Sequence, residues 1–118
     1  MNDKVSLVPE LLSPAGDMER FERALYFGAD AIYIGGSAFS MRAAPSNFTT
    51  EELRIACDIA HKNNVKVYLT CNTVPRNNEI DALPDFLLNW REAGVDAFII
   101  SDMGVMSLAK KYTPDVDI

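Results

Sequence analysis

The sequence has 118 residues, 48% of them apolar, and a formal net charge of −6. This length predicts a single domain. The acidic balance argues against this chain alone binding a phosphate backbone, because such binding needs clustered lysine and arginine. The N-terminus lacks the basic stretch and apolar core of a secretory signal, and no apolar run reaches the roughly 18 residues of a membrane helix. We therefore expect a cytoplasmic protein with no membrane segment.

Short apolar strands alternate with amphipathic helices along the chain. The first strand, Glu10–Ser13, precedes a helix in which Met18, Phe21 and Leu25 share one face. The later predicted elements are a strand at 30–34, a helix from 49 to about 62, a strand at 65–70, a helix at 79–93, a strand at 96–100, a helix at 104–111 and the start of a strand at 116–118. The regular part of the 79–93 helix is expected to begin near Pro84, which has no backbone N–H to donate.

Several residues are typical of helix ends. Asp17 precedes the first helix, and its carboxylate can accept the free N–H groups of the first turn. Thr49 and Glu52 have the spacing of a capping box. Gly28 and Gly94 end helices, where glycine favours the left-handed backbone conformation.

An internal repeat supports the fold class. The segment 28–34 resembles 94–100, each with a Gly-x-Asp-Ala entry into an apolar strand. Alternating strands and helices predict an α/β fold, either a (β/α)₈ TIM-type barrel or an open doubly wound sheet. The lack of a Gly-x-Gly-x-x-Gly turn favours the barrel. Because a full barrel needs about 250 residues, we expect residues 1–118 to be one truncated domain, with four βα units and the start of a fifth strand, and no second domain.

The predicted site lies where strands end and helices begin, since the chemistry of α/β barrels lies at that rim. Four strand ends carry small or polar residues. The candidate ligand-binding residues are Ser13, Gly16, Gly35, Gly36, Arg42, Cys71, Asn72 and Ser101, and the candidate catalytic residue is Asp102. Arg42 and Arg76 are loop cations that can hold a carboxylate or phosphate. The alternatives are a tight capped connector at 13–17 and a solvated loop charge at Arg42.

A protease centre is not complete in this sequence. It contains no His-Glu-x-x-His zinc motif. Cys71 is expected to end a strand and face the pocket, but the only histidine, His61, is expected at the opposite rim. The strand between them spans roughly 20 Å at about 3.3 Å per residue, whereas a Cys–His pair needs about 3 Å. Cys57 is expected to be a small core residue. Asp102 could act with a carboxylate from outside this chain.

Four segments resemble the N-terminal region of the U-thirty-two family of collagenase-like peptidases: Glu10–Asp17, Gly28–Tyr33, Phe39–Ala43 with Asn47 and Phe48, and Ser101–Gly104. The resemblance covers nearly the whole chain. It implies a (β/α)₈-type barrel in the complete protein and one of two function classes. The first is proteolysis, a hydrolase activity on peptides, and the second is hydroxylation of RNA or ubiquinone. The sequence is most similar to the branch that forms 5-hydroxyuridine in tRNA.

The resemblance also implies an iron–sulfur cluster in several relatives, held by four cysteines. This chain has only Cys57 and Cys71, so we expect no cofactor here and a cluster only in a full-length protein. The expected partners are tRNA or a peptide substrate, together with the C-terminal half of the barrel. A third hypothesis is that these 118 residues alone are an inactive scaffold half. Two open sheet edges would favour self-association of such a half.

Overall fold

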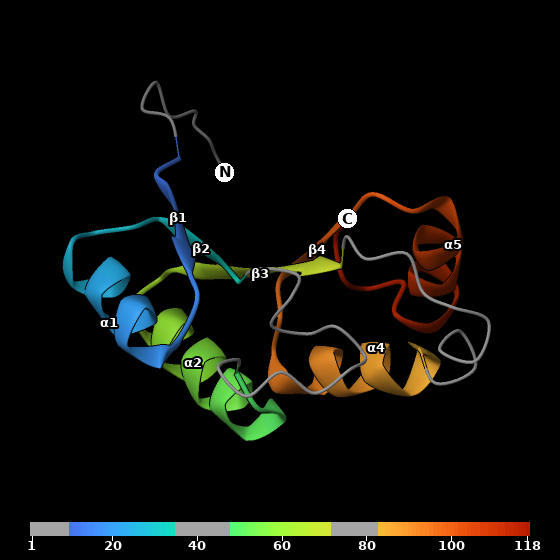
Figure 1. The fold of residues 1–118 in the computed structure, drawn as a ribbon, viewed down its shortest axis with the longest axis horizontal. Coiled ribbons are helices and arrows are strands. Elements are labelled where there is room, and N and C mark those ends of the chain that lie inside the picture. The colour runs from blue at the N-terminus through green and yellow to red at the C-terminus, as the bar shows by residue number, and fades with distance from the viewer. Residues whose placement is uncertain (1–9, 35–47, 72–82) are drawn as a thin grey trace.

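The computed structural model describes residues 10–34, 48–71 and 83–118. They form an α/β fold of four βα units (Figure 1). The elements are β1 (Leu12–Ala15), α1 (Met18–Tyr26), β2 (Ala31–Ile34), α2 (Thr50–Lys62), β3 (Lys66–Cys71), α4 (Leu83–Ala93), β4 (Ala97–Ile100) and α5 (Met103–Tyr112). The first strand lies two residues later than the sequence pattern predicts, while the other three strands agree with it to within one residue.

The helices begin and end at the residues that sequence chemistry indicates. The Asp17 carboxylate accepts a hydrogen bond from Arg20 N at 2.9 Å, which caps α1. Thr49 and Glu52 form both arms of the predicted capping box at α2. Gly28 and Gly94 follow helices with φ of 88° and 107°, so each adopts the left-handed conformation that ends a helix. Pro84 is the second residue of α4 as the structure describes it, and residues 79–82 of the predicted helix lie outside the described residues.

All four strands are parallel and follow one another in the order β1-β2-β3-β4. The last residues add a further parallel contact, because Asp117 bridges to Ala97 and its carbonyl accepts Phe98 N at 2.8 Å. This is the predicted start of a fifth strand. We call the edge formed by Ala15, Ile34, Cys71 and Ile100 the C-terminal rim, and the edge where the strands begin the N-terminal rim.

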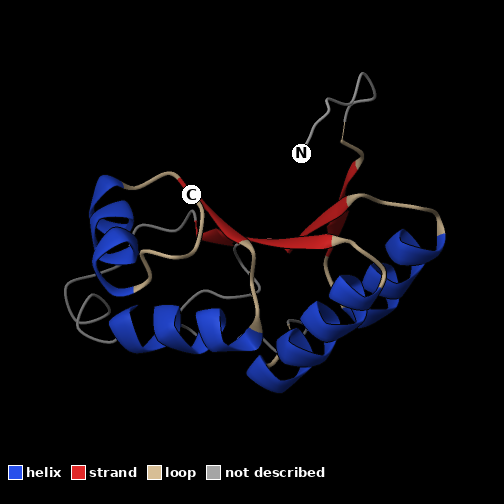
Figure 2. Cartoon of the chain, turned by 180° about the vertical axis from the view of Figure 1, so that it is seen from behind, coloured by secondary structure: helices blue, strands red, loops and turns tan. Residues whose placement is uncertain are grey.

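Helices cover one face of the sheet. In Figures 1 and 2, α1, α2 and α4 lie along the same side of the strands, and α5 lies beside the end of β4. Side chains that alternate onto this covered face are buried, among them Ile32, Leu69 and Phe98. The strand register places Tyr33, Tyr68 and Ile99 on the opposite face, which we call the uncovered face, since no helix within the described ranges lies over it.

The hydrophobic core lies between the covered face and the helices. Phe21 from α1, Leu53 from α2 and Leu87 from α4 are fully buried there against strand residues. Trp90 of α4 packs edge-on against Phe98 of β4, with ring centroids 6.3 Å apart. None of the helices in the described ranges is long and apolar enough to cross a membrane.

Candidate functional site

Asp102 lies at the C-terminal rim, two residues beyond β4, and is the N-cap of α5. Its carboxylate Oδ2 accepts a hydrogen bond from Val105 N at 3.0 Å. Gly104 leaves room for this carboxylate, because a Cβ at that position would lie 3.0 Å from Oδ2. Asp102 is half-buried and the adjacent Ser101 is exposed. The cap holds the carboxylate in a fixed position at the rim while leaving it accessible to a ligand.

The turn between β1 and α1 places a cation at the same rim. Asp17 caps the helix, and a Cβ on Gly16 would lie 3.2 Å from an Nη nitrogen of Arg20. The Arg20 guanidinium therefore folds back over Gly16 into space that a side chain would occupy. Arg20 is not among the predicted site residues, because the position of its guanidinium over Gly16 depends on the conformation of the turn and not on a sequence spacing. The Ser13 side chain is half-buried and lies on the covered face of the sheet, not on the uncovered face.

Cys71 is the last residue of β3, and the structure buries its side chain among the described core residues. Residues 67, 69 and 71 alternate onto the same face, and the register pairs Cys71 with Ile100. Its side chain is buried within the hydrophobic core. Burial raises the pKa of the Cys71 thiol to about 12. The thiol is therefore protonated at neutral pH and is a poor nucleophile.

The other candidates lie outside the described residues. These are Gly35, Gly36, Arg42, Asn72 and the second loop cation, Arg76. The described part of the rim thus carries the β1–α1 turn with Arg20 beside one outer strand of the sheet and the Ser101–Asp102 pair beyond the other. The role of every candidate in ligand binding stays a prediction.

His61 lies at the opposite rim, in the last turn of α2. Its Nε2 is 2.7 Å from Oδ2 of Asp96, the residue immediately before β4. Cys71 ends β3 at the C-terminal rim. The two residues are therefore separated by the length of a strand, as the sequence analysis predicted. The structure supports no Cys71–His61 nucleophilic pair.

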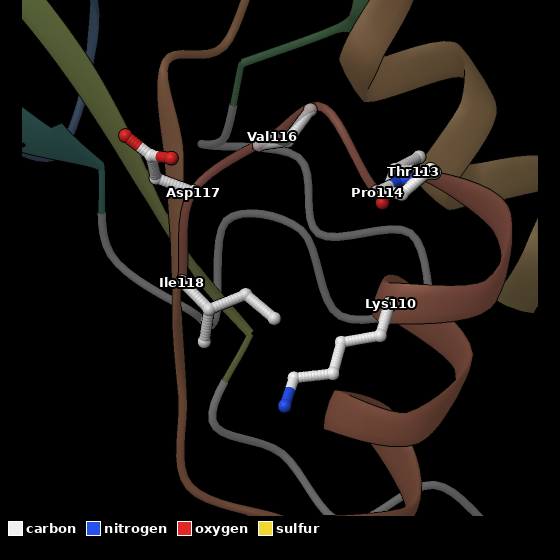
Figure 3. A pocket seen from close by; sticks show the side chains of 6 residues that line it. All are labelled: Lys110, Thr113, Pro114, Val116, Asp117 and Ile118. Atoms are coloured by element: carbon white, nitrogen blue, oxygen red, sulfur yellow. The ribbon is translucent and has the colours of Figure 1, made fainter.

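Two of the hollows that described residues line contain none of the predicted site residues. One, of about 430 Å³, lies on the uncovered face toward the N-terminal rim, lined by Leu12, Lys66, Tyr68, Asp96, Ala97, Phe98, Ile99, Asp117 and Ile118. The other, of about 360 Å³, lies between the end of α5 and the last residues. Figure 3 shows Lys110 extending from α5 toward Ile118 while Asp117 points away.

Tyr68 is one of the polar residues that line the larger of these two hollows. Its hydroxyl donates to the Glu10 carboxylate at 3.1 and 3.2 Å, reaching across β2 on the uncovered face. Partial burial raises the pKa of Tyr68, and the hydrogen bond to Glu10 adds to this effect. This contact joins β3 to the segment before β1.

The cysteines of this chain do not fit an iron–sulfur cluster. Such a cluster usually needs four thiolates, and the chain has two cysteines. Burial raises the pKa of both Cys57 and Cys71 to about 12, so neither is a ready thiolate. Within the described ranges, no group of three or more His, Cys, Asp or Glu side chains could hold a metal ion.

The family model described as "Peptidase family U32" matches residues 16–118 of this sequence. The chain belongs to this family. It is similar to an uncharacterized protease of Methanocaldococcus jannaschii, with 46% identity over 86% of this chain and 25% of the relative. It is also similar to the tRNA hydroxylation protein P of Helicobacter pylori strain 26695, with 44% identity over 92% of this chain and 26% of the relative.

A solved U32 peptidase has the same fold. All of this chain superimposes on 49% of that structure with a TM-score of 0.64 and 13% sequence identity. The four βα units of this chain therefore match half of that U32 structure. The chain spans 25 to 30% of the length of the curated U32 relatives that it matches first.

Proposed function

We propose that this chain is the first part of a longer U32 protein that acts in tRNA hydroxylation, in the formation of 5-hydroxyuridine. The observation that carries the proposal is the 44% identity to a tRNA hydroxylation protein P over 92% of the chain. The substrate is then tRNA. Because these 118 residues have a net charge of −6, most of the cationic surface for RNA comes from the remainder of the protein.

In this proposal the C-terminal rim is the working site. Asp102 is the catalytic residue, since its carboxylate is fixed by the α5 cap at the rim. Ser101, Gly16, Gly35, Gly36, Arg42 and Asn72 are the proposed ligand-binding residues. Arg20 joins them as a cation held over the β1–α1 turn. An iron–sulfur cluster, where the longer protein has one, is held by cysteines outside this chain.

Proteolysis is the second candidate, favoured by the 46% identity to an uncharacterized protease. A Cys or Ser nucleophile with a histidine base would need a histidine at the C-terminal rim. The single histidine of this chain is bonded to Asp96 at the N-terminal rim. Such a base must therefore come from elsewhere in the longer protein. For the 118 residues alone we propose an inactive half of the fold.

Nucleoside mass analysis of tRNA tests the proposal. Cells lacking the gene are compared with cells complemented by the wild type, Asp102→Ala or Asp102→Ser. A serine keeps an oxygen that caps α5, so Asp102→Ser separates loss of the carboxylate from loss of the cap. We expect loss of 5-hydroxyuridine in the deleted cells, restored by the wild type and by neither variant.

Two results would contradict this proposal in different ways. Unchanged modified nucleosides in the deleted cells would refute tRNA hydroxylation. Cofactor-free cleavage of a denatured protein by the longer chain would then support proteolysis. Full restoration by Asp102→Ser would leave the function standing and reduce Asp102 to a helix cap.

A further inference from the structure

The internal repeat places an aspartate at the same position before β2 and before β4. Gly28-Ala29-Asp30-Ala31 corresponds to Gly94-Val95-Asp96-Ala97. The Asp30 carboxylate accepts a hydrogen bond from Leu11 N at 2.8 Å. The Asp96 carboxylate accepts one from Val67 N, also at 2.8 Å. The same side chain thus binds the neighbouring strand in both copies of the repeat.

Each aspartate also binds the same neighbour through its backbone. Asp30 N donates to Leu11 O at 2.9 Å, and Asp96 N donates to Val67 O at 2.9 Å. Leu11 and Val67 each precede a paired residue by one position, because Leu12 pairs with Ala31 and Tyr68 pairs with Ala97. Each aspartate therefore forms two hydrogen bonds with the residue opposite it in the register. Its carboxylate accepts from that residue's N–H, and its own N–H donates to that residue's carbonyl. We call the two arrangements the Asp30 clamp and the Asp96 clamp.

We infer that Asp30 and Asp96 are positioning residues that fix the register of β1 against β2 and of β3 against β4. A slip of one residue breaks both hydrogen bonds of a clamp at once. It also moves a strand end by about 3.3 Å and turns every side chain to the other face. A fixed register also fixes the positions of the strand ends at the C-terminal rim. That this matters for activity rests on the proposed function, whereas the two clamps are argued from the hydrogen bonds alone.

The two clamps differ in their connection to the helices. Oδ2 of Asp96 also lies 2.7 Å from Nε2 of His61, so this clamp is joined to the end of α2. A Cβ on Gly94 would lie 3.2 Å from Cβ of Cys57, whereas a Cβ on Gly28 would meet nothing within 4 Å. The Asp96 clamp is thus joined to α2, whereas within the described ranges the Asp30 carboxylate has no such bond to a helix. Loss of Asp96 should loosen the end of α2, and loss of Asp30 should not loosen any helix end.

Amide hydrogen exchange of this chain, measured by NMR, tests the inference. The variants are Asp30→Ala, Asp30→Asn, Asp96→Ala and Asp96→Asn. Asp58→Ala is the control, because it removes the same charge from an exposed residue that pairs only with Lys62 among the described side chains. In the wild type we expect slow exchange of the Leu11 and Val67 amides.

Each alanine variant should accelerate exchange of its own clamped amide by about tenfold relative to an amide at the centre of the sheet, such as that of Leu69. Asparagine keeps an acceptor oxygen and should restore most of the protection. Asp96→Ala alone should also accelerate exchange at the end of α2. Asp58→Ala should change none of these.

Three results would overturn the inference. The first is a uniform acceleration of all strand amides, which would indicate general destabilisation. The second is exchange of the clamped amide that is as fast in the asparagine variant as in the alanine variant. The third is rapid exchange of the Leu11 amide in the wild type, a measurement that needs no variant to fold. Because the readout is amide exchange, it does not depend on the tRNA experiment, and either proposal can fail alone.

Discussion

The two buried thiols predict a loss of stability at alkaline pH. Burial raises the pKa of Cys57 and Cys71 to about 12, and the negative charge of Asp96 contributes at Cys57. In the unfolded chain each thiol has its ordinary pKa of 9.0. Above pH 9.0 the unfolded state therefore loses protons that the folded state keeps. The stability is fully present below that pH and falls as the pH rises toward 12.

The size of this loss follows from the two pKa values. At about pH 10, one unit above the unfolded pKa and two below the folded one, each thiol costs about 1.4 kcal/mol. The two thiols together cost about 2.8 kcal/mol. A domain is typically stable by about 5–15 kcal/mol, so this loss is readily measured.

Urea unfolding at about pH 7.5 and about pH 10 measures this loss of unfolding free energy. The wild type is compared with the double variant Cys57→Ala, Cys71→Ala. The cavities left by alanine lower stability at both pH values. The fall between the two pH values should nevertheless be smaller in the variant, by about 2.8 kcal/mol. Tyrosine and lysine titration affects both proteins alike and cancels. Equal falls would refute the assignment of buried, protonated thiols and would reopen Cys71 as a nucleophile.

Two further predictions concern the rim and the uncovered face. In the longer protein, Arg20→Gln should weaken tRNA binding and lower the slope of log affinity against log salt by about 0.9, as expected for one lost phosphate contact. Arg23→Gln, on the same helix but paired with Glu19 at 3.4 Å, should change neither, and equal effects would contradict a role for Arg20. The 118-residue chain should form dimers or larger species by light scattering, because Ile99 is 41% exposed on a face that no described helix covers. Ile99→Lys should reduce this association. Ile55→Lys, at a comparably exposed site on α2, should leave it unchanged. A monomer at high concentration would contradict the prediction.

The elements of this fold were predictable because their signals are local. Asp17, Thr49 and Glu52 cap helices through contacts within one turn, so their spacing alone indicates the helix starts. The alternation of strands and helices likewise indicates the α/β class, because a parallel strand needs a crossover before the next one. The separation of His61 from Cys71 followed from the same alternation.

The face that each side chain occupies was decided only by the tertiary structure. Strand alternation has a period of two, so the sequence indicates which residues share a face but not which face the helices cover. The structure places Ser13 with Ala15 on the covered face and Pro14 on the opposite one. Cys71 ends a strand at the predicted rim, and its thiol is buried within the core.

The sequence by itself determined the class of fold, the predicted helix caps, the repeat and the family resemblance, since each is a pattern in the order of residues and needs no knowledge of which strands pair. The tertiary structure decided what the repeated aspartates do. Asp96 and Val67 are 29 residues apart, and Asp30 and Leu11 are 19 apart. Only the pairing of the strands brings each carboxylate to the backbone N–H from which it accepts a hydrogen bond.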